Sequence, residues 1–182
     1  VVTTTGDPVF TPGQCQHIID VGRKEPRLTA TIGGQAKGKL DVKKRTSHIS
    51  WIPFKNMQPM YEKIEATMKK VNDNHFGFDG AGVTEVAQYT EYPEGGFYNW
   101  HIDSDLEGMH EPPVRKVSMT LLLSPESEFE GGDLEVMSEG NVAKLKQGHA
   151  IFFASYLQHR VTPVTRGIRR SLVMWFGGPR FK

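Results

Sequence analysis

The sequence predicts an α+β protein that is mainly β, with a jelly-roll core preceded by supporting helices. Two amphipathic helical segments lie within the first 75 residues. From residue 83 onward, glycine, proline and aspartate divide the chain into about eight short strand-like runs, which leaves little room for another helix. Short strands in this number are typical of two facing sheets with a cavity between them.

The two helices are predicted from capping residues and apolar spacing. Thr11-Pro12-Gly13-Gln14 matches a capping box with proline at the first helical position, so a helix should run to about Gly22. Its expected core face is Cys15, Ile18, Ile19 and Val21. A second helix is expected over about 58–74, because apolar residues recur there every three or four positions. These residues are Met60, Tyr61, Ile64, Met68 and Val71.

The segment between the helices is basic. From residue 23 to residue 50 it contains eight lysines and arginines but only two acidic residues. Several glycines and the lack of a sustained period predict a long loop, followed by a short strand at about 48–52. We expect this loop to act as a binding lid.

The remainder of the chain is expected to form eight strands. Each is a short run of apolar or branched residues bounded by turn residues. Their approximate ranges are 83–92, 97–102, 115–123, 132–137, 141–145, 149–153, 158–164 and 168–176.

Length and composition indicate one globular domain. The 182 residues are enough to bury a core, so we expect a single domain over 1–182, with helical support over about 11–75 and the jelly-roll core over about 83–178. The hydrophobic fraction of 37% and charged fraction of 24% are ordinary for a soluble protein. No apolar run approaches the roughly 20 residues that span a bilayer, so we expect no membrane partner.

The first residues and the cysteine content predict a cytoplasmic location. Val1 to Asp7 lacks the basic and apolar regions of a secretory signal. Cys15 is the one cysteine, which excludes an internal disulfide and suits a reducing compartment. The net charge of +1 disfavours nucleic acid as a partner.

His101 and Asp103 form a His-x-Asp pair, and His159 follows much later in the chain. Residues two apart in a strand share a face, so the pair can reach one point in the cavity. Alone the pair is weak evidence, because short polar pairs at strand ends are usually turn or surface groups. Two imidazoles and one carboxylate together suit a non-haem Fe(II) oxygenase. Asp105 is the main rival to Asp103 as the carboxylate ligand.

An arginine near the end of the chain would complete such a site. A guanidinium binds a carboxylate through two parallel hydrogen bonds and stays charged, which suits it to hold a 2-oxoglutarate co-substrate. Of four candidates, Arg160 points away from the face of His159 and Arg166 lies in a turn. Side chains alternate between the two faces of the last strand, but this alternation alone does not show whether Arg169 or Arg170 faces the cavity.

The chain resembles the Fe(II)- and 2-oxoglutarate-dependent dioxygenases of the prolyl 4-hydroxylase branch, particularly the PKHD-type hydroxylases. The segments that carry the resemblance include Gln88-Tyr89-Thr90, Phe97 to Asp103, Glu130 to Leu134, His159 to Val164 and the Gly-x-Arg segment that continues to Trp175. It implies a double-stranded β-helix, or cupin-like, core. It also implies His101, Asp103 and His159 as iron ligands and Arg169 as the arginine that binds 2-oxoglutarate.

Four further positions enter the site through the resemblance. Tyr92 occupies the place of a tyrosine that bonds the co-substrate in related prolyl hydroxylases, and Tyr98 resembles an active-site tyrosine on the strand of His101. Leu122 stands where animal prolyl hydroxylases carry a tyrosine that assists the arginine, which leaves the assisting residue unidentified; Thr120 or Ser171 could supply a hydroxyl. An ordinary core role for each of the two tyrosines, or a plain strand role for Thr120 and Ser171, is the alternative.

The implied activity is hydroxylation of a prolyl residue in a peptide or protein. It would be coupled to oxidative decarboxylation of 2-oxoglutarate to succinate and CO2, with Fe(II) as cofactor, O2 as second co-substrate and ascorbate as candidate reductant. The basic loop 23–50 would contact the substrate and favour an acidic target. Two alternatives stay open: a hydroxylase of a free amino acid or small metabolite, and a non-catalytic jelly-roll binding module. The sequence gives no oligomeric state.

Overall fold

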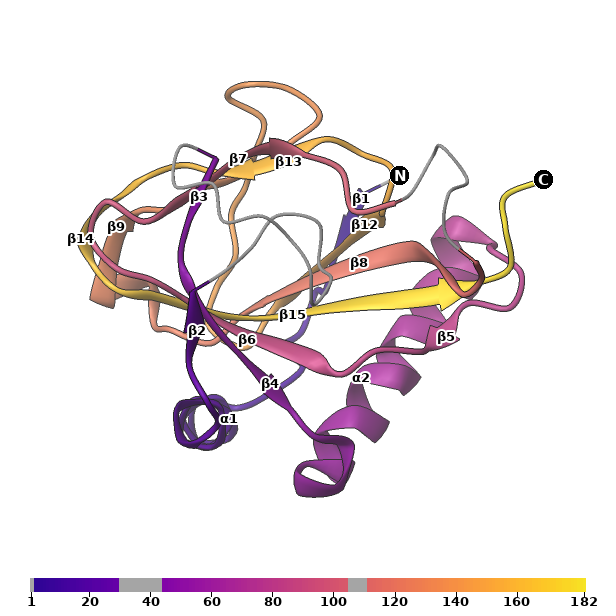
Figure 1. Cartoon of the computed structure of the whole chain (residues 1–182), viewed down its shortest axis with the longest axis horizontal. Helices are drawn as coiled ribbons and strands as arrows, with labels where there is room; N and C mark the ends of the chain where they lie inside the picture. Colours follow the sequence, from indigo (N-terminus) through magenta and orange to yellow (C-terminus); the bar gives the residue numbers. More distant parts are fainter. Residues whose placement is uncertain (1, 30–43, 105–110) are drawn as a thin grey trace.

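Two β-sheets face each other, and two helices cover the outer side of the larger one (Figure 1). This architecture comes from a computed structural model that describes residues 2–29, 44–104 and 111–182. The large sheet has the order β1 (Val2–Thr4), β12 (Ala150–Ala154), β8 (Val114–Leu122), β15 (Arg169–Gly178), β6 (Ala87–Tyr92), β4 (His48–Ile52) and β2 (Leu28–Thr29). The short β5 (Gly82–Val83) pairs with β15.

The small sheet carries most of the residues of interest. Its order is β11 (Val142–Ala143), β10 (Leu134–Val136), β13 (His159–Val161), β7 (Phe97–His101) and β3 (Arg45–Thr46). A separate two-stranded sheet is made by β14 (Val164–Gly167) and β9 (Phe129–Gly131). Every described strand pair is antiparallel. The predicted mainly-β jelly roll with N-terminal helices is confirmed.

Both predicted helices are present. In α1 (Pro12–Lys24), the Thr11 hydroxyl accepts a hydrogen bond from the Gln14 amide, and the Gln14 side chain accepts one from the Thr11 amide, which completes the capping box. The second helix, α2 (Gln58–Val71), continues into a π-helical turn at Asn72–Phe76. Short 3-10 turns lie at Phe54–Asn56 and Glu126–Glu128. Neither α-helix is long and apolar enough to span a membrane.

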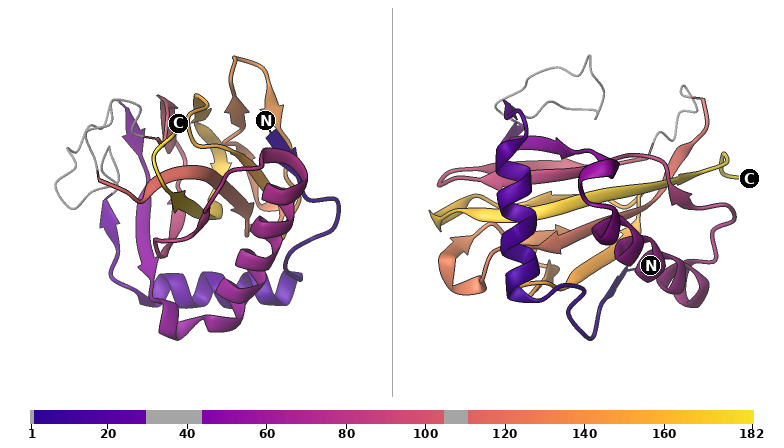
Figure 2. Two further views of the ribbon diagram at one scale, coloured as in Figure 1. Left: turned by 90° about the vertical axis from the view of Figure 1, so that its right-hand side faces the viewer. Right: turned by 90° about the horizontal axis from the view of Figure 1, so that it is seen from below.

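The buried apolar residues form two unequal clusters. The larger fills the space between the helices and the large sheet, and among the described residues it has 22 buried members, including Ile18, Met68 and Phe176. The smaller lies between the two sheets and has seven, including Leu134 and Phe153. Figure 2 shows the helices on the side of the large sheet that faces away from the small sheet. The inner face of the large sheet carries part of the smaller cluster, including Ile151 and Phe153, beside polar side chains.

Several predicted boundaries were wrong. The segment 23–47 is not all loop, because its ends form β2 and β3; residues 30–43 lie outside the described part. The predicted strand 83–92 is broken into β5 and β6, and 158–164 is broken between β13 and β14. Pro163 lies at the second break, where proline has no amide hydrogen for a ladder. Strands β1 and β9 were not predicted, because each has only three residues.

Candidate metal centre

Two histidines face each other on neighbouring strands of the small sheet. His101 ends β7 and His159 begins β13, and the two are direct partners in the antiparallel register. Asp103 lies next to both: its Oδ1 is 3.5 Å from Nε2 of His101, and its Oδ2 is 3.4 Å from Nε2 of His159. One donor atom from each residue lies within 4.8 Å of the other two. The structure thus brings together the three residues that the sequence singled out.

Hydrogen bonds orient both imidazole rings. Nδ1 of His101 is 2.7 Å from the carbonyl oxygen of Asn99, and Nδ1 of His159 is 3.0 Å from that of Leu157. Because a carbonyl only accepts, each Nδ1 carries the proton and each Nε2 keeps its lone pair for a ligand. Burial, followed by the neighbouring His159, lowers the pKa of His101 to about 3. His101 is therefore neutral at physiological pH, as a metal ligand must be.

The expected reason for the position of Asp103 was wrong. Asp103 is not in the strand with His101, because β7 ends at His101. Its amide instead donates a hydrogen bond to the Ser155 carbonyl at 2.9 Å, and the Ser104 amide donates to the same oxygen at 3.0 Å. Ser155 follows β12, so the large sheet fixes Asp103 next to histidines of the small sheet.

Two donors hold one oxygen of the Asp103 carboxylate. Oδ2 accepts hydrogen bonds from the Ser118 hydroxyl at 2.7 Å and the Trp175 indole at 2.9 Å. Ser118 also bonds to the Ser155 hydroxyl at 2.9 Å. Burial acts to raise the pKa of Asp103, but the two histidines and these hydrogen bonds outweigh it and lower the pKa. The carboxylate is thus charged, and Oδ1 is the oxygen with free lone pairs.

A β-bulge brings Tyr98 onto the face of His101. Simple alternation would place residues three apart on opposite faces of a strand. The register of β7 with β13 shifts between the His101 and Tyr98 pairs, and the extra residue re-aims the side chain. The Tyr98 and His101 rings consequently stack with centroids 3.5 Å apart and planes 7° apart.

The structure distinguishes Arg169 from Arg170. Arg169, Ser171 and Trp175 all point inward from β15, and Arg169 is only 3% exposed. Arg170 points to the helix side, where its Nε lies 3.4 Å from Glu91. No carboxylate of the described residues lies within ion-pair distance of Arg169, which donates to the Ser171 hydroxyl at 3.4 Å. Burial lowers the pKa of this guanidinium.

A glycine makes room for the Arg169 side chain. Gly132 has φ of 61°, and a Cβ atom there would lie 2.9 Å from Cδ of Arg169 and 2.9 Å from Cγ2 of Val164. Any side chain at this position would therefore push against the arginine as well as strain the backbone. The Gly131-Gly132 turn is thus matched to the position of the guanidinium.

The remaining predicted site residues lie on the inner face of the large sheet. Tyr92 is the register partner of Arg169, and the Arg169 guanidinium lies 5.7 Å from its ring centroid. Thr120 is 8% exposed, and Leu122 is the register partner of Ser171. Asp105 lies outside the described residues. The hydroxyl near Arg169 thus comes from Ser171.

Sequence reasoning missed several polar residues of the site. Ser118, Ser155 and Trp175 support Asp103, and Arg45 lies against Tyr98. Trp175 is six residues after Arg169, so strand alternation puts the two side chains on one face, which was a usable signal. For Ser118 the signal was a small polar residue within a strand that is otherwise apolar.

The residues present fit Fe(II) and an anionic co-substrate. Two imidazoles and one carboxylate on one side of a point form the donor set of non-haem Fe(II) sites, with the other positions open. A buried guanidinium without an acidic partner is costly to bury unless an anion from outside neutralises it. The carboxylate of a co-substrate would supply that anion.

Comparison with known proteins agrees with this fit. Residues 87–177 match the family model described as the 2OG-Fe(II) oxygenase superfamily. A PKHD-type hydroxylase from Idiomarina loihiensis is 38% identical over 158 residues, which covers 81% of this chain and 71% of that protein. A PKHD-type hydroxylase from Acidovorax ebreus is 39% identical over 93 residues. That match covers 48% of this chain and 41% of the relative, less than half of its length.

Solved structures share the fold at lower identity. The viral collagen prolyl hydroxylase from Paramecium Bursaria Chlorella virus-1 superposes with a TM-score of 0.74 at 21% identity, covering 97% of this chain and 96% of that one. A Pseudomonas putida prolyl-4-hydroxylase gives a TM-score of 0.68 at 21% identity, covering 99% and 93%. These likenesses confirm the jelly-roll fold.

Proposed function

The chain belongs to the 2OG-Fe(II) oxygenase superfamily, and on that premise we propose that it hydroxylates a prolyl residue of a peptide or protein. Two observations carry the proposal. The His101–Asp103–His159 triad brings three metal-binding side chains together, and the buried Arg169 lies on the same face of β15 as Trp175, which bonds to Asp103. In a protein that had lost this activity, nothing would favour retention of all three candidate metal ligands together with the arginine. The coupled products would be succinate and CO2 from 2-oxoglutarate.

The triad would hold Fe(II) through Nε2 of both histidines and Oδ1 of Asp103. When bound, Fe(II) supplies the activation of O2 that couples 2-oxoglutarate oxidation to insertion of one oxygen atom into a substrate C–H bond. The chain's own part is to orient both imidazoles through their Nδ1 hydrogen bonds, to keep His101 neutral through burial, and to keep the Asp103 carboxylate charged through its neighbours. Neither His101 nor Asp103 then has to lose a proton before it binds the metal.

Arg169 would bind the carboxylate of 2-oxoglutarate that lies farther from the metal. Its planar fork can form two parallel hydrogen bonds, and Ser171 holds it from one side. Tyr92 lies against the guanidinium and Tyr98 against His101, so both would line the co-substrate. Thr120, on the strand next to Ser171, would complete the lining.

Apolar residues between the sheets would keep water from the reacting atoms. The smaller buried cluster supplies them, and it includes Phe153 and Val136, the latter being the register partner of His159. The Phe153 ring contacts the His159 ring directly, with centroids 4.7 Å apart. A dry, low-dielectric pocket strengthens the pairing of Arg169 with a carboxylate.

The prolyl substrate is supported by the nature of the structural neighbours. They include a viral collagen prolyl hydroxylase, and a Trichoplax adhaerens prolyl hydroxylase solved with a hypoxia inducible factor peptide. The basic segment 23–50 would contact the peptide and favour acidic residues in it. Arg45 is buried and does not contribute to that basic surface. A reducing compartment such as the cytoplasm, with ascorbate as reductant, would suit a ferrous site.

The test is an oxygen-transfer assay with a library of peptides that contain proline. Protein loaded with Fe(II) and given 2-oxoglutarate and O2 should add one oxygen atom to a subset of peptides, detected by mass spectrometry, and release succinate. His101→Ala should abolish both products. Turnover of free proline without any peptide product would instead favour the small-molecule hydroxylase. Metal binding without succinate release under any condition would instead favour the non-catalytic binding module.

A further inference from the structure

Arg45 lies inside the site rather than on the basic loop to which the sequence assigned it. It belongs to β3, the edge strand next to β7, and is 7% exposed. Its register partner is Tyr98, the residue that stacks on His101. The sequence pattern gives Arg45 no role in binding the metal or the co-substrate. Its role must therefore be inferred from the contacts that it makes in the structure.

Two neutral side chains fix the Arg45 guanidinium. Its Nε donates to the Ser47 hydroxyl at 2.8 Å, and its Nη2 donates to Oε1 of Gln88 at 3.1 Å. The same Gln88 oxygen accepts a hydrogen bond from Thr90 at 3.0 Å. Gln88 and Thr90 belong to β6 of the large sheet. Arg45 thus connects the edge of the small sheet to the large sheet.

Arg45, Tyr98 and His101 form a three-layer stack. The guanidinium carbon of Arg45 lies 4.3 Å from the centroid of the Tyr98 ring. That ring is nearly parallel to the imidazole of His101, 3.5 Å away. A cation over the ring face is attracted to the π electrons, so the arginine restrains the tyrosine plane. The tyrosine plane in turn limits rotation of the imidazole.

Two other arginines that stack on aromatic rings, Arg115 and Arg160, are neutralised by glutamates, whereas Arg45, like Arg169, is not. Arg115 lies 3.8 Å from the Trp175 ring centroid and binds Glu85 at 2.6 Å. Arg160 lies 5.0 Å from the Trp100 ring centroid and binds Glu135 at 2.6 Å. No described carboxylate lies within ion-pair distance of Arg45. The burial of this charge is therefore compensated by its two hydrogen bonds and by the stack on Tyr98.

We propose that Arg45 is a positioning residue for the metal ligand His101 and acts through Tyr98. The hydrogen bond from Nδ1 to Asn99 fixes one edge of the imidazole, and the stack fixes its plane. Together they direct the Nε2 lone pair toward Asp103 and the metal position. Groups behind a metal ligand of this kind commonly change metal affinity by 10- to 100-fold. The role rests on the proposed metal site.

The test is Co(II) binding to the protein without co-substrate, followed by the visible absorption of the bound ion. Arg45→Met should weaken Co(II) binding about tenfold and shift the absorption bands. Tyr98→Leu should weaken binding as well. In the Tyr98→Leu background, Arg45→Met should cause little further loss, because its effect passes through the tyrosine ring. Equal losses of affinity in both backgrounds would overturn the proposal, as would no loss in either.

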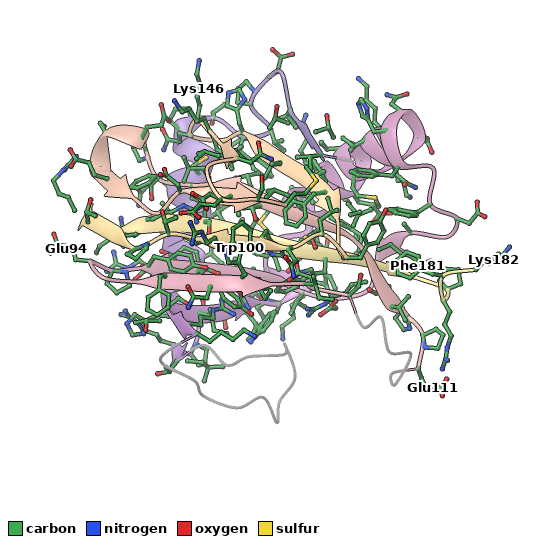
Figure 3. All side chains as sticks on the ribbon, turned by 90° about the horizontal axis from the view of Figure 1, so that it is seen from above. Glu94, Trp100, Glu111, Lys146, Phe181 and Lys182 are labelled. Carbon is green, nitrogen blue, oxygen red and sulfur yellow. The ribbon has the colours of Figure 1, made fainter. Side chains whose placement is uncertain are left out.

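Arg160→Met is the matched control. Arg160 follows His159 in β13 and points to the opposite face of the small sheet, where it stacks over Trp100, a residue labelled in Figure 3. This variant should leave Co(II) affinity unchanged. If circular dichroism shows that Arg45→Met does not fold, Arg45→Lys is the second variant. It keeps the positive charge but lacks the planar guanidinium that stacks on Tyr98, so it should still weaken Co(II) binding. Wild-type Co(II) affinity in Arg45→Lys would contradict a role for the stack.

Failure of the proposed function looks different from failure of this inference. If the wild-type protein binds no Co(II), the metal site itself is wrong. If the wild type binds and Arg45→Met binds equally well, the metal site stands and the positioning role falls.

Discussion

Asp103 depends on two side chains that reach it from neighbouring strands. Trp175 of β15 and Ser118 of β8 are register partners, and both donate to the same carboxylate oxygen. We predict that Ser118→Ala and Trp175→Phe each weaken Co(II) binding by about 10-fold, because the freed carboxylate can rotate away from the histidines. Isothermal titration of Co(II) into each variant measures this.

Ser124→Ala provides the control for the loss of a buried hydroxyl. Ser124 is also fully buried, but it bonds to backbone atoms of Ile168 and Arg170 at the start of β15 rather than to Asp103. It should cost stability and leave Co(II) affinity intact. Equal affinity losses in Ser118→Ala and Ser124→Ala would mean that general destabilisation, and not the carboxylate bond, is responsible.

Gly132 is predicted to control the 2-oxoglutarate requirement. In Gly132→Ala the new Cβ atom would lie within 2.9 Å of Arg169 Cδ, so the guanidinium must move. We expect the KM for 2-oxoglutarate to rise by about 10- to 100-fold, since small misplacements of a binding group are costly. Succinate release measured against 2-oxoglutarate concentration reports this change.

Gly140→Ala separates this steric effect from backbone strain. Gly140 has φ of 79°, a similar left-handed conformation, but a Cβ atom there would meet no described atom within 4 Å beyond its chain neighbours. Its substitution should lower stability by about 1 kcal/mol and leave the KM for 2-oxoglutarate unchanged. A raised KM in both variants would show that Gly132 acts through strain alone.

At the level of residues, the sequence predicted the candidate metal ligands correctly because their order and spacing along the chain form a recognisable pattern. The spacing of His101, Asp103 and His159 is visible in the chain, and the structure brings them together. Ser118 and Trp175 were missed because they can both donate to Asp103 only when β8 and β15 pair in the register that places them side by side. Register is set by long-range pairing and cannot be read from either strand alone.

At the scale of elements, helices were easier to predict than strands. A capping box and a 3.6-residue period are local signals, and α1 begins where Thr11 and Gln14 place it. β3 has only two residues, and it is a strand because it pairs with β7. The bulge in β7 was also invisible, although it decides that Tyr98 faces His101. Such features follow from pairing partners and not from composition.

Glu91 links four elements, and we predict that it makes stability depend on acid pH. It lies in β6 and contacts Arg23 of α1, Arg27 beside β2 and Arg170 of β15. Burial acts to raise its pKa, but the Tyr89 hydrogen bond and the arginines outweigh burial, so the pKa lies below its ordinary 4.5. On acidification the unfolded chain therefore takes up the proton first.

The stabilisation from Glu91 is thus fully present above pH 4.5 and is lost as pH falls through the lowered pKa. Glu91→Gln should lower the free energy of unfolding at pH 7 by about 1–3 kcal/mol, and by less below pH 4.5. Urea unfolding at several pH values measures both. Glu65→Gln, which removes an exposed pair with Lys69, should change stability by no more than about 0.5 kcal/mol. A pH-independent Glu91→Gln effect would contradict the prediction.

At the scale of the whole molecule, the two sheets are unequally supported. The large sheet is held by the helices and by the larger apolar cluster, whereas the small sheet rests on the cluster of seven buried residues. The metal centre spans this weaker boundary. His101 and His159 belong to the small sheet, and Asp103 is fixed to the large sheet by Ser155, Ser118 and Trp175. A bound metal therefore joins the two sheets across the boundary that the smaller apolar cluster fills.

Metal removal should loosen the small sheet selectively. Binding stabilises only conformations in which the three ligands are together, by about 2.7 kcal/mol when the metal is at 100 times its Kd. Amides whose exchange requires the sheets to separate should then exchange up to about 100 times faster after chelation. We expect this for β7 and β13, while β6, β8 and β15 should change little. Hydrogen exchange with Co(II) and with EDTA, read by mass spectrometry, tests it. In His101→Ala the two conditions should match, and equal protection of both sheets by metal would refute the selective coupling.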